Sequence, residues 1–193
     1  MCVVSVAGIV LAAGFSRRLG RSKQNVMIAG ETLLQRTLRI AHAAQLKPVI
    51  VVVQSGIDLP EQIQASAFEI VLNTEAEEGI ASSIRAGIHA VAKRQGIQGA
   101  VLMTCDQVGM NADHLRALYA MPDRLTGSRY ANKTAVPAYF PHRDFDELLQ
   151  LRGDTGARGL LSGAYAITAE DLGLDVDTEE DVERARQFLH EPP

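Results

Sequence analysis

The segment VLAAGFSRRLGRSKQ, residues 10–24, places small residues and positive charge directly after an apolar run. Ala12, Ala13 and Gly14 carry almost no side chain, so their backbone N–H groups can approach a ligand closely. The cations that follow are Arg17, Arg18, Arg21 and Lys23. Arginine suits bidentate contacts to phosphate oxygens and lysine suits a point contact. The pattern predicts either a polyphosphate site or an ordinary turn with a solvated basic stretch.

The glycine spacing excludes two common nucleotide loops. A P-loop has four residues between its glycines and continues directly with Lys and Ser or Thr. Here five residues separate Gly14 from Gly20, and Lys23 comes three positions later. The G-x-G-x-x-G run of dinucleotide-binding folds does not open the first expected helix either. The spacing therefore argues against a Walker-type site and against hydride transfer.

Aspartates follow two further segments and are candidate metal ligands. Asp106 ends the run AVLMTCDQ at the carboxyl end of an expected central strand, where a doubly wound sheet opens its ligand crevice. Mg²⁺ is held by one or two carboxylates together with substrate phosphates, although Asp106 could equally be a helix N-cap. In LDVDTEEDVERA, Asp175 and Asp177 precede a helix expected to begin near Thr178, where capping is again a sufficient role.

The cysteines and histidines show no spacing that indicates zinc binding or a nucleophile. Cys2 and Cys105 are the two cysteines, and the five histidines are scattered along the chain. Cys105 ends an apolar run, so we expect a small buried hydrophobe rather than a reactive thiol. This cysteine usage favours a reducing, cytoplasmic location.

Composition limits the possible partners. The chain has 193 residues, of which 47% are hydrophobic and 22% charged, values typical of one folded domain. A net charge of −4 argues against a nucleic-acid or anionic membrane surface, both of which require a broad basic field. The apolar N-terminal run lacks a basic leader and is too short to span a bilayer, so we expect a strand there.

Apolar runs and helix-period segments alternate along the first two thirds of the chain. Runs at 3–11, 48–53 and 100–104 predict strands buried on both faces. Three segments carry an apolar stripe and are expected to cover the sheet: Leu34, Leu38 and Ala41; Ile80, Ile84, Ile88 and Val91; and Val182, Ala185 and Leu189. This alternation predicts an α/β fold with a Rossmann-like, doubly wound and mainly parallel sheet.

A single domain over residues 1–193 is expected to have two functional halves. Residues 1–121 form the nucleotide-binding half and residues 122–193 the acceptor-side half. From about 122 to 176 the alternation stops, and DRLTGSRYANKTAVPAYFP indicates short strands and turns. RGDTGARGLL indicates a loop that enters a helix. We interpret this region as a small β-rich insertion on the same sheet.

Five motifs follow one another in the order of a known family. They are LAAGFSRRLGRSK, EEGIASSIRAG, TCDQ, LRGDTGARGLL and DVDTEEDVERA. Over nearly the whole chain they resemble nucleotidyltransferases of the molybdenum cofactor cytidylyltransferase type. The first motif is specific to a superfamily of NTP transferases, and the last two resemble its molybdopterin branch. The resemblance implies a nucleotide-diphospho-sugar transferase-like fold and transfer of CMP from CTP to the phosphate of molybdopterin, with release of pyrophosphate.

The resemblance also implies site residues. Arg18 and Lys23 would bind the triphosphate and act in catalysis together with Asp106. The other implied nucleotide-binding residues are Leu11, Ala12, Ala13, Gly14, Ser16, Gly79 and Ser83. Asp106 would be a Mg²⁺ ligand with Asp177 as the candidate second ligand, and the choice between Asp175 and Asp177 stays open.

Four positions in three motifs depart from the family pattern. Val108 stands where the family usually has Pro, and Ile80 stands where it usually has Met. Ala135, Val136 and Pro137 stand where the family tends to have Gly-His-Pro, so an acceptor-side contact of that histidine is missing. Val108 and Ile80 are apolar replacements, and the missing histidine concerns the acceptor rather than the nucleotide.

Other functions share these motifs. A guanylyltransferase of the same pathway is associated with LAGG, whereas this chain has LAAG, which is associated with CTP. A cytidylyltransferase for a sugar or isoprenoid phosphate would differ after residue 120. A non-catalytic nucleotide-binding chaperone of a molybdenum enzyme is the third alternative, and intact Arg18, Lys23 and Asp106 argue against it. The acceptor, any client enzyme or its chaperone, and the oligomeric state are not determined by the sequence.

Overall fold

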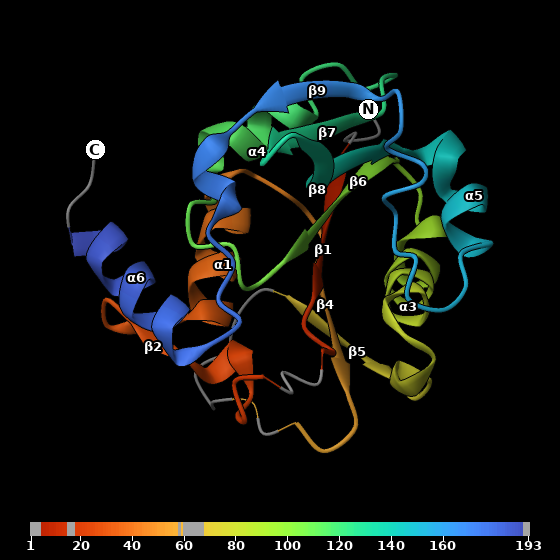
Figure 1. Ribbon diagram of the computed structural model, residues 1–193. Helices are drawn as coiled ribbons and strands as arrows, with labels where there is room; N and C mark the ends of the chain where they lie inside the picture. Colours follow the sequence, from red (N-terminus) through yellow and green to blue (C-terminus); the bar gives the residue numbers. More distant parts are fainter. Residues whose placement is uncertain (1–4, 15–17, 58, 60–67, 191–193) are drawn as a thin grey trace.

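Seven strands form one sheet through the centre of the protein (Figure 1), in the order β5-β4-β1-β6-β8-β7-β9. The computed structural model describes residues 5–14, 18–57, 59 and 68–190. The strands are β1 Ser5–Leu11, β4 Val49–Gln54, β5 Glu69–Asn73, β6 Ile97–Thr104, β7 Thr126–Tyr130, β8 Lys133–Pro141 and β9 Tyr165–Thr168. β5, β4, β1 and β6 are parallel, β8 is antiparallel to both β6 and β7, and β9 is parallel to β7. The prediction of a mainly parallel α/β sheet is confirmed.

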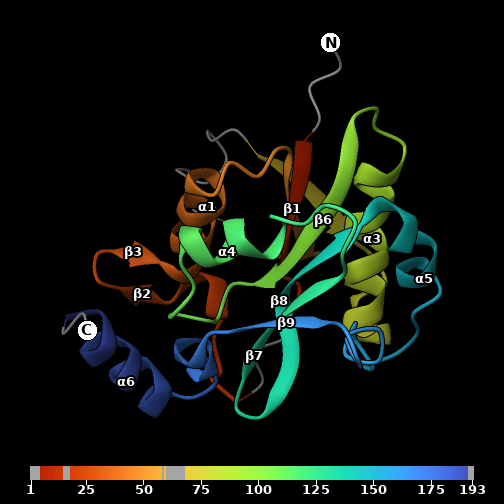
Figure 2. The same ribbon diagram turned by 90° about the horizontal axis from the view of Figure 1, so that it is seen from above.

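Helices cover both faces of this sheet (Figure 2), as a doubly wound fold requires. They are α1 Leu33–Ala43 and α4 Ala112–Leu118 on one face, and α3 Ile80–Ala92 and α5 Phe145–Leu149 on the other. Neighbouring residues of β1 show the alternation, because Val10 packs in the core under α1 and α4 while Ile9 packs in the core under α3 and α5. Each strand of the centre therefore contributes to two cores.

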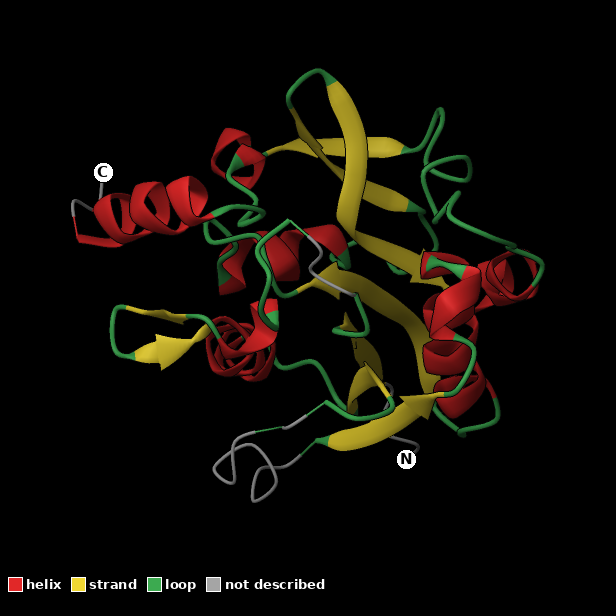
Figure 3. Cartoon of the chain, turned by 60° about the horizontal axis from the view of Figure 1, so that its bottom comes forward, coloured by secondary structure: helices red, strands yellow, loops and turns green. Residues whose placement is uncertain are grey.

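The third amphipathic segment forms α6 Glu179–His190, which does not cover the sheet. It packs on a small hairpin of β2 Met27–Ile28 and β3 Glu31–Thr32, and Figure 3 shows this helix and hairpin beside each other, away from the main sheet. Its buried residues, Val182 and Ala185, belong to a third core with Ile28 of the hairpin, separate from the two cores that line the sheet. The prediction that all three helices cover the sheet was wrong for α6.

The region after residue 122 extends the same sheet, as expected, through β7, β8 and β9. Within it, RGDTGARGLL forms successive turns instead of entering a helix. Gly153 and Gly156 have φ angles of 62° and 56°, in the left-handed region that interrupts a right-handed helix. The expectation of a helix at this position was therefore wrong.

Short 3-10 helices complete the described elements, at Lys23–Asn25, Ala76–Glu78, His142–Asp144 and Glu170–Gly173. None of the helices in the described ranges is long and apolar enough to cross a membrane. Leu11, the last residue of β1, pairs with Thr104, the last residue of β6. The loops that leave these two strands therefore begin side by side at the carboxyl edge of the sheet.

Candidate functional site

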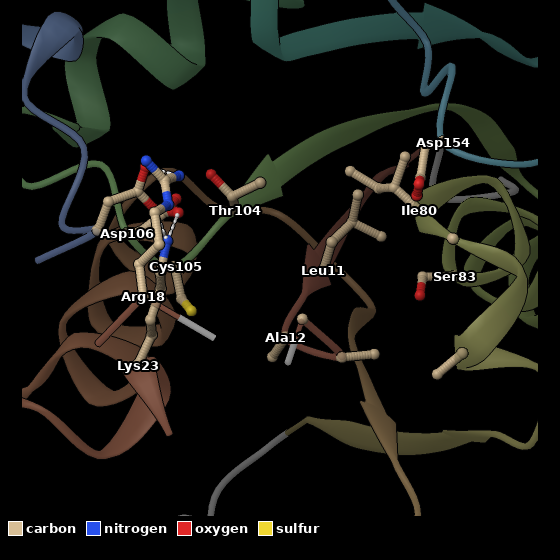
Figure 4. A pocket seen from close by; sticks show the side chains of 15 residues that line it. Leu11, Ala12, Arg18, Lys23, Ile80, Ser83, Thr104, Cys105, Asp106 and Asp154 are labelled. Carbon is tan, nitrogen blue, oxygen red and sulfur yellow. Dashed lines mark hydrogen bonds and ion pairs between the residues drawn. The ribbon is translucent and has the colours of Figure 1, made fainter. Parts of the chain in front are cut away.

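A cavity of about 370 Å³ opens at this carboxyl edge (Figure 4). Among the predicted site residues, those that line it are Leu11, Ala12, Ala13, Gly14, Arg18, Lys23, Gly79, Ser83, Asp106 and Asp177. Ser16 lies outside the described residues. The cavity is within the usual size range of ligand pockets, and it lies where open α/β sheets bind ligands. The structure therefore brings the residues predicted from separate motifs together in one place.

Two cations and two carboxylates meet at one end of the cavity. Lys23 Nζ lies 3.1 Å from Asp106 Oδ2 and also donates to Asp177 Oδ1. Arg18 donates to the other oxygen of Asp177. Burial lowers the pKa of Lys23, but the charges and hydrogen bonds of Asp106 and Asp177 outweigh it, so that the pKa is raised overall. Lys23 is therefore a fixed positive charge.

A short antiparallel bridge brings Asp177 to Asp106. Gln107 pairs with Asp175, and the backbone N–H of Val176 donates to the carbonyl oxygen of Asp106 at 3.0 Å. The segment before α6 therefore lies along the segment after β6. Backbone pairing thus makes residues far apart in sequence neighbours, and Lys23 contacts the carboxylates of both segments.

Neither of these aspartates caps a helix. The helix after Asp106 is α4, and its N-cap is Asn111, whose side chain accepts from His114 N. At α6, Thr178 Oγ1 accepts from Asp181 N, and Asp181 in turn accepts from Thr178 N. The N-cap alternative for both carboxylates is wrong, because their side chains are directed to the cations.

Asp175 differs from Asp177 in its surroundings. Burial, followed by the charge of Asp106, raises the pKa of Asp175 to about 6. Asp175 is not among the residues that line the cavity, whereas Asp177 is. Geometry therefore favours Asp177 as the partner of Asp106.

The opposite end of the cavity is formed by the start of α3 and the turn around Asp154. Figure 4 shows Ile80, Ser83 and Asp154 across the cavity from Arg18 and Lys23. Gly79 begins α3 with a φ of 119°, and a Cβ there would lie 2.2 Å from Asp154 Oδ1. Only glycine allows the Asp154 turn to approach the helix this closely.

Glu78 links the Asp154 turn to α3 through one ion pair and one backbone hydrogen bond. Glu78 accepts hydrogen bonds from Arg85 and, at 3.1 Å, from the backbone N–H of Gly153. The hydrogen bond from Arg85 has the larger effect, and together with the bond from Gly153 it lowers the pKa of Glu78 to about 2. Asp154 was not predicted as a site residue, although it lies in the RGDTGARG motif, because the motif gives no sign of which edge of the sheet the turn reaches.

Cys105 lines the cavity but is not suited to nucleophilic catalysis. The residue is 6% exposed, and burial together with the neighbouring Asp106 charge raises the pKa of its thiol to about 12. This confirms the expectation of a buried hydrophobe. None of the histidines in the described chain lines the cavity.

The carboxylates of Asp106 and Asp177 are suited to bind a divalent cation that is also bound by substrate phosphates. Asp106 and Asp177 both contact the Lys23 ammonium, so their oxygens already converge on one cationic position. In the described ranges no group of three or more His, Cys, Asp or Glu residues could hold a metal ion by itself. Two carboxylates completed by substrate phosphates are the usual protein share of a Mg²⁺ site.

Comparison with known proteins gives the family. The MobA-like NTP transferase domain matches residues 8–170. The chain is 32% identical to the purine catabolism protein PucB of Bacillus subtilis, over 94% of this chain and 96% of that protein. It is 34% identical to a probable molybdenum cofactor guanylyltransferase of Opitutus terrae, over 50% of this chain and 44% of that protein.

Solved structures share the fold of this chain. Rv0371c from Mycobacterium tuberculosis superposes with a TM-score of 0.80 and 28% identity, covering 96% of this chain and 99% of that one. The same protein in complex with manganese superposes with a TM-score of 0.77 and 25% identity, covering 95% and 99%. The match runs from within β1 to the first residue of the 3-10 helix Glu170–Gly173, and we conclude that this chain belongs to the MobA-like NTP transferase domain family.

Proposed function

We propose that the protein is a Mg²⁺-dependent cytidylyltransferase that transfers CMP from CTP to the phosphate of molybdopterin. The observation that carries the proposal is the polarity of one cavity: its charged end holds both Arg18 and Lys23 together with Asp106 and Asp177, and its other end holds Ile80, Ser83 and the single carboxylate of Asp154. The charged end suits a metal-bound triphosphate and the other end suits a base and ribose. The buried, free Cys105 thiol fits a cytoplasmic location.

The reaction requires no covalent bond to the protein. An oxygen of the acceptor phosphate attacks the α-phosphorus of CTP and forms a new P–O bond. The bond between the α-phosphorus and the oxygen leading to the β-phosphorus breaks, and pyrophosphate leaves with that electron pair. Catalysis then depends on alignment and on stabilisation of charge, as in other phosphoryl-type transfers.

Each charged residue has a part in that alignment. Lys23 and Arg18 would exchange their Asp177 contacts for oxygens of the triphosphate and stabilise the charge on the leaving pyrophosphate. Asp106 and Asp177 would hold Mg²⁺, which supplies Lewis-acid stabilisation of the phosphates. Rv0371c, which shares this fold at 25% identity, was solved in complex with manganese, and this supports the proposal of a divalent ion here.

The choice of CTP rests on Ala13. This residue lines the cavity and is 6% exposed, so its methyl group occupies space close to the ligand. A methyl group there leaves room for a pyrimidine better than for a purine. Transfer of GMP from GTP is the second candidate, and the probable guanylyltransferase of Opitutus terrae favours it. The same relative supports molybdopterin as the acceptor, with a molybdenum enzyme or its chaperone as the later partner.

Product analysis tests the proposal. Purified protein is incubated with Mg²⁺, molybdopterin and either CTP or GTP, pyrophosphate is measured, and the pterin product is identified by mass. We expect a CMP adduct and pyrophosphate with CTP. A GMP adduct would replace the proposal with the guanylyl alternative, and no adduct with either nucleotide would exclude molybdopterin as the acceptor.

A further inference from the structure

Asn73, at the end of β5, makes three hydrogen bonds and is only 4% exposed. Its side-chain nitrogen donates to Ser82 Oγ at 2.8 Å and to Ser83 Oγ at 2.9 Å. Its side-chain oxygen accepts from the backbone N–H of Glu75 at 2.9 Å. Because a backbone N–H can only donate, the amide oxygen must face Glu75 and the amide nitrogen must face the serines.

This orientation decides how the two serine hydroxyls are used. Ser82 donates its own hydrogen to the carbonyl oxygen of Gly79 at 2.8 Å. Ser83 accepts from Asn73, so that the amide does not take up the hydroxyl hydrogen of Ser83. Ser83 lines the cavity and Ser82 does not. The hydrogen of Ser83 can therefore be directed at a ligand.

We propose that Asn73 is a positioning residue that makes Ser83 a hydrogen-bond donor to an acceptor atom of the nucleotide base, O2 or N3 of cytosine. This inference rests on the proposed function. The location follows from charge, because the triphosphate belongs at the end that holds Arg18 and Lys23, and Ser83 lies across the cavity from them (Figure 4). Cytosine carries both acceptors on the edge that a pyrimidine presents to a pocket wall.

Replacing the donor by an acceptor of the same size tests the arrangement. In Asn73→Asp a carboxylate oxygen faces Ser83, which would then donate its hydrogen to Asp and lose it for the base. We expect the KM for CTP to rise about tenfold, as for one lost hydrogen bond, with kcat and the KM for the acceptor nearly unchanged. Ser83→Ala removes the donor directly and should give the same shift without a buried charge.

Two comparisons separate this role from general packing. The double variant Asn73→Asp/Ser83→Ala should be no worse than either single variant, because both changes remove the same donor. Ser82→Ala is the matched control, since it also removes one Asn73 hydrogen bond but leaves Ser83 intact. Its KM for CTP should remain that of the wild type. Additive effects, or an equal shift in Ser82→Ala, would overturn the inference.

A ligand without a base completes the experiment. Ribose 5-triphosphate should compete with CTP for binding to the wild type, to Asn73→Asp and to Ser83→Ala with equal affinity. It lacks the base acceptor atom to which Ser83 would donate. If its affinity falls in the variants as much as that of CTP, Ser83 contacts the ribose or acts on the fold, and the inference is wrong. Absence of CTP turnover in the wild type would overturn the proposed function and this inference together. Normal wild-type turnover with unaltered variants would overturn the inference alone.

Discussion

Asp106 contacts Lys23 and caps no helix, so its charge can be removed without disturbing a helix end. Asp106→Asn keeps the size of the side chain but removes the charge that a metal ion needs. We expect kcat with Mg²⁺ to fall at least about a hundredfold, the lower range for losing one charge-stabilising group, with little change in melting temperature. Steady-state kinetics and thermal unfolding measure both.

Asp177→Asn should cause a loss of similar size, because Asp177 shares Lys23 with Asp106. Asp175→Asn is the matched control, since Asp175 is close in sequence but does not line the cavity. Wild-type turnover in Asp106→Asn would exclude a metal ligand at that position. If kcat falls in Asp175→Asn as much as in Asp177→Asn, the choice of Asp177 over Asp175 as the second metal ligand is wrong.

Lys23 and Arg21 offer a second matched pair of basic residues. Lys23 lines the cavity, whereas Arg21 pairs with the exposed Glu179 at 2.8 Å and does not line it. Lys23→Ala should lose about 2–4 kcal/mol of transition-state stabilisation, measured as kcat/KM for CTP. Arg21→Ala should leave kcat/KM near the wild-type value. Equal effects of the two changes would mean that the loop is only a general basic surface.

Ala13 is expected to set the choice of nucleotide. Wrongly sized groups in a tight pocket differ by about 1–3 kcal/mol, so the wild type should prefer CTP over GTP by about ten- to two-hundred-fold in kcat/KM. Ala13→Gly should reduce this ratio without inverting it, because specificity is summed over several contacts. The two kcat/KM values measured for each protein give the ratio. A wild type that uses both nucleotides equally, or an unchanged ratio in Ala13→Gly, would remove the physical basis for cytidylyl transfer.

At the scale of elements, His114 links α4 to β7. Its Nε2 lies 2.7 Å from Ser128 Oγ, and Ser128 donates to the carbonyl oxygen of Pro137, so the histidine must be the donor to Ser128. Burial lowers the pKa of His114 below its ordinary value of 6.5. The unfolded chain therefore takes up this proton more readily than the folded one.

The contribution of neutral His114 to the free energy of unfolding is fully present above pH 6.5. It is lost as the pH falls through the lower pKa that His114 has in the folded protein. The free energy of unfolding, measured with denaturant between pH 7.5 and 5, should decrease in the wild type. It should decrease less steeply in His114→Asn. Identical slopes in the two proteins would mean that His114 does not contribute to the pH dependence of folding.

The sequence predicts buried elements more accurately than it predicts where surface elements pack. β1, β4 and β6 follow from continuous apolar runs, and α1 and α3 follow from wide apolar stripes. The stripe of α6 was recognised, but a stripe does not say which surface it covers. β5 was not predicted, because as an edge strand it leaves Ile70 and Leu72 exposed at 45% and 54%. The hairpin of β2 and β3 has only two residues in each strand and carries no period-2 signal.

At the scale of the whole molecule, the candidate site was predictable by residue type but not by arrangement. Small residues, cations and strand-end carboxylates left both a phosphate site and a purely structural role open, and the family resemblance selected the site residues. The pairing of Gln107 with Asp175, which sets Asp177 beside Asp106, joins segments that no local pattern connects. Asn73 and Asp154 were missed for the same reason, since their roles depend on neighbours that are distant along the chain.

The bridge between Gln107 and Asp175 limits how such proteins can be recombined. Asp154 and Asp177 lie in the later part of the chain, yet they line the same cavity as the opening loop. A chimera that takes residues 122–193 from a relative with another acceptor would therefore import part of the nucleotide site as well. The backbone pairing at 106–108 and 174–176 must stay in register across the junction for the graft to place its carboxylate. Under the proposed function, acceptor choice and nucleotide chemistry could therefore not be exchanged as independent modules in this chain.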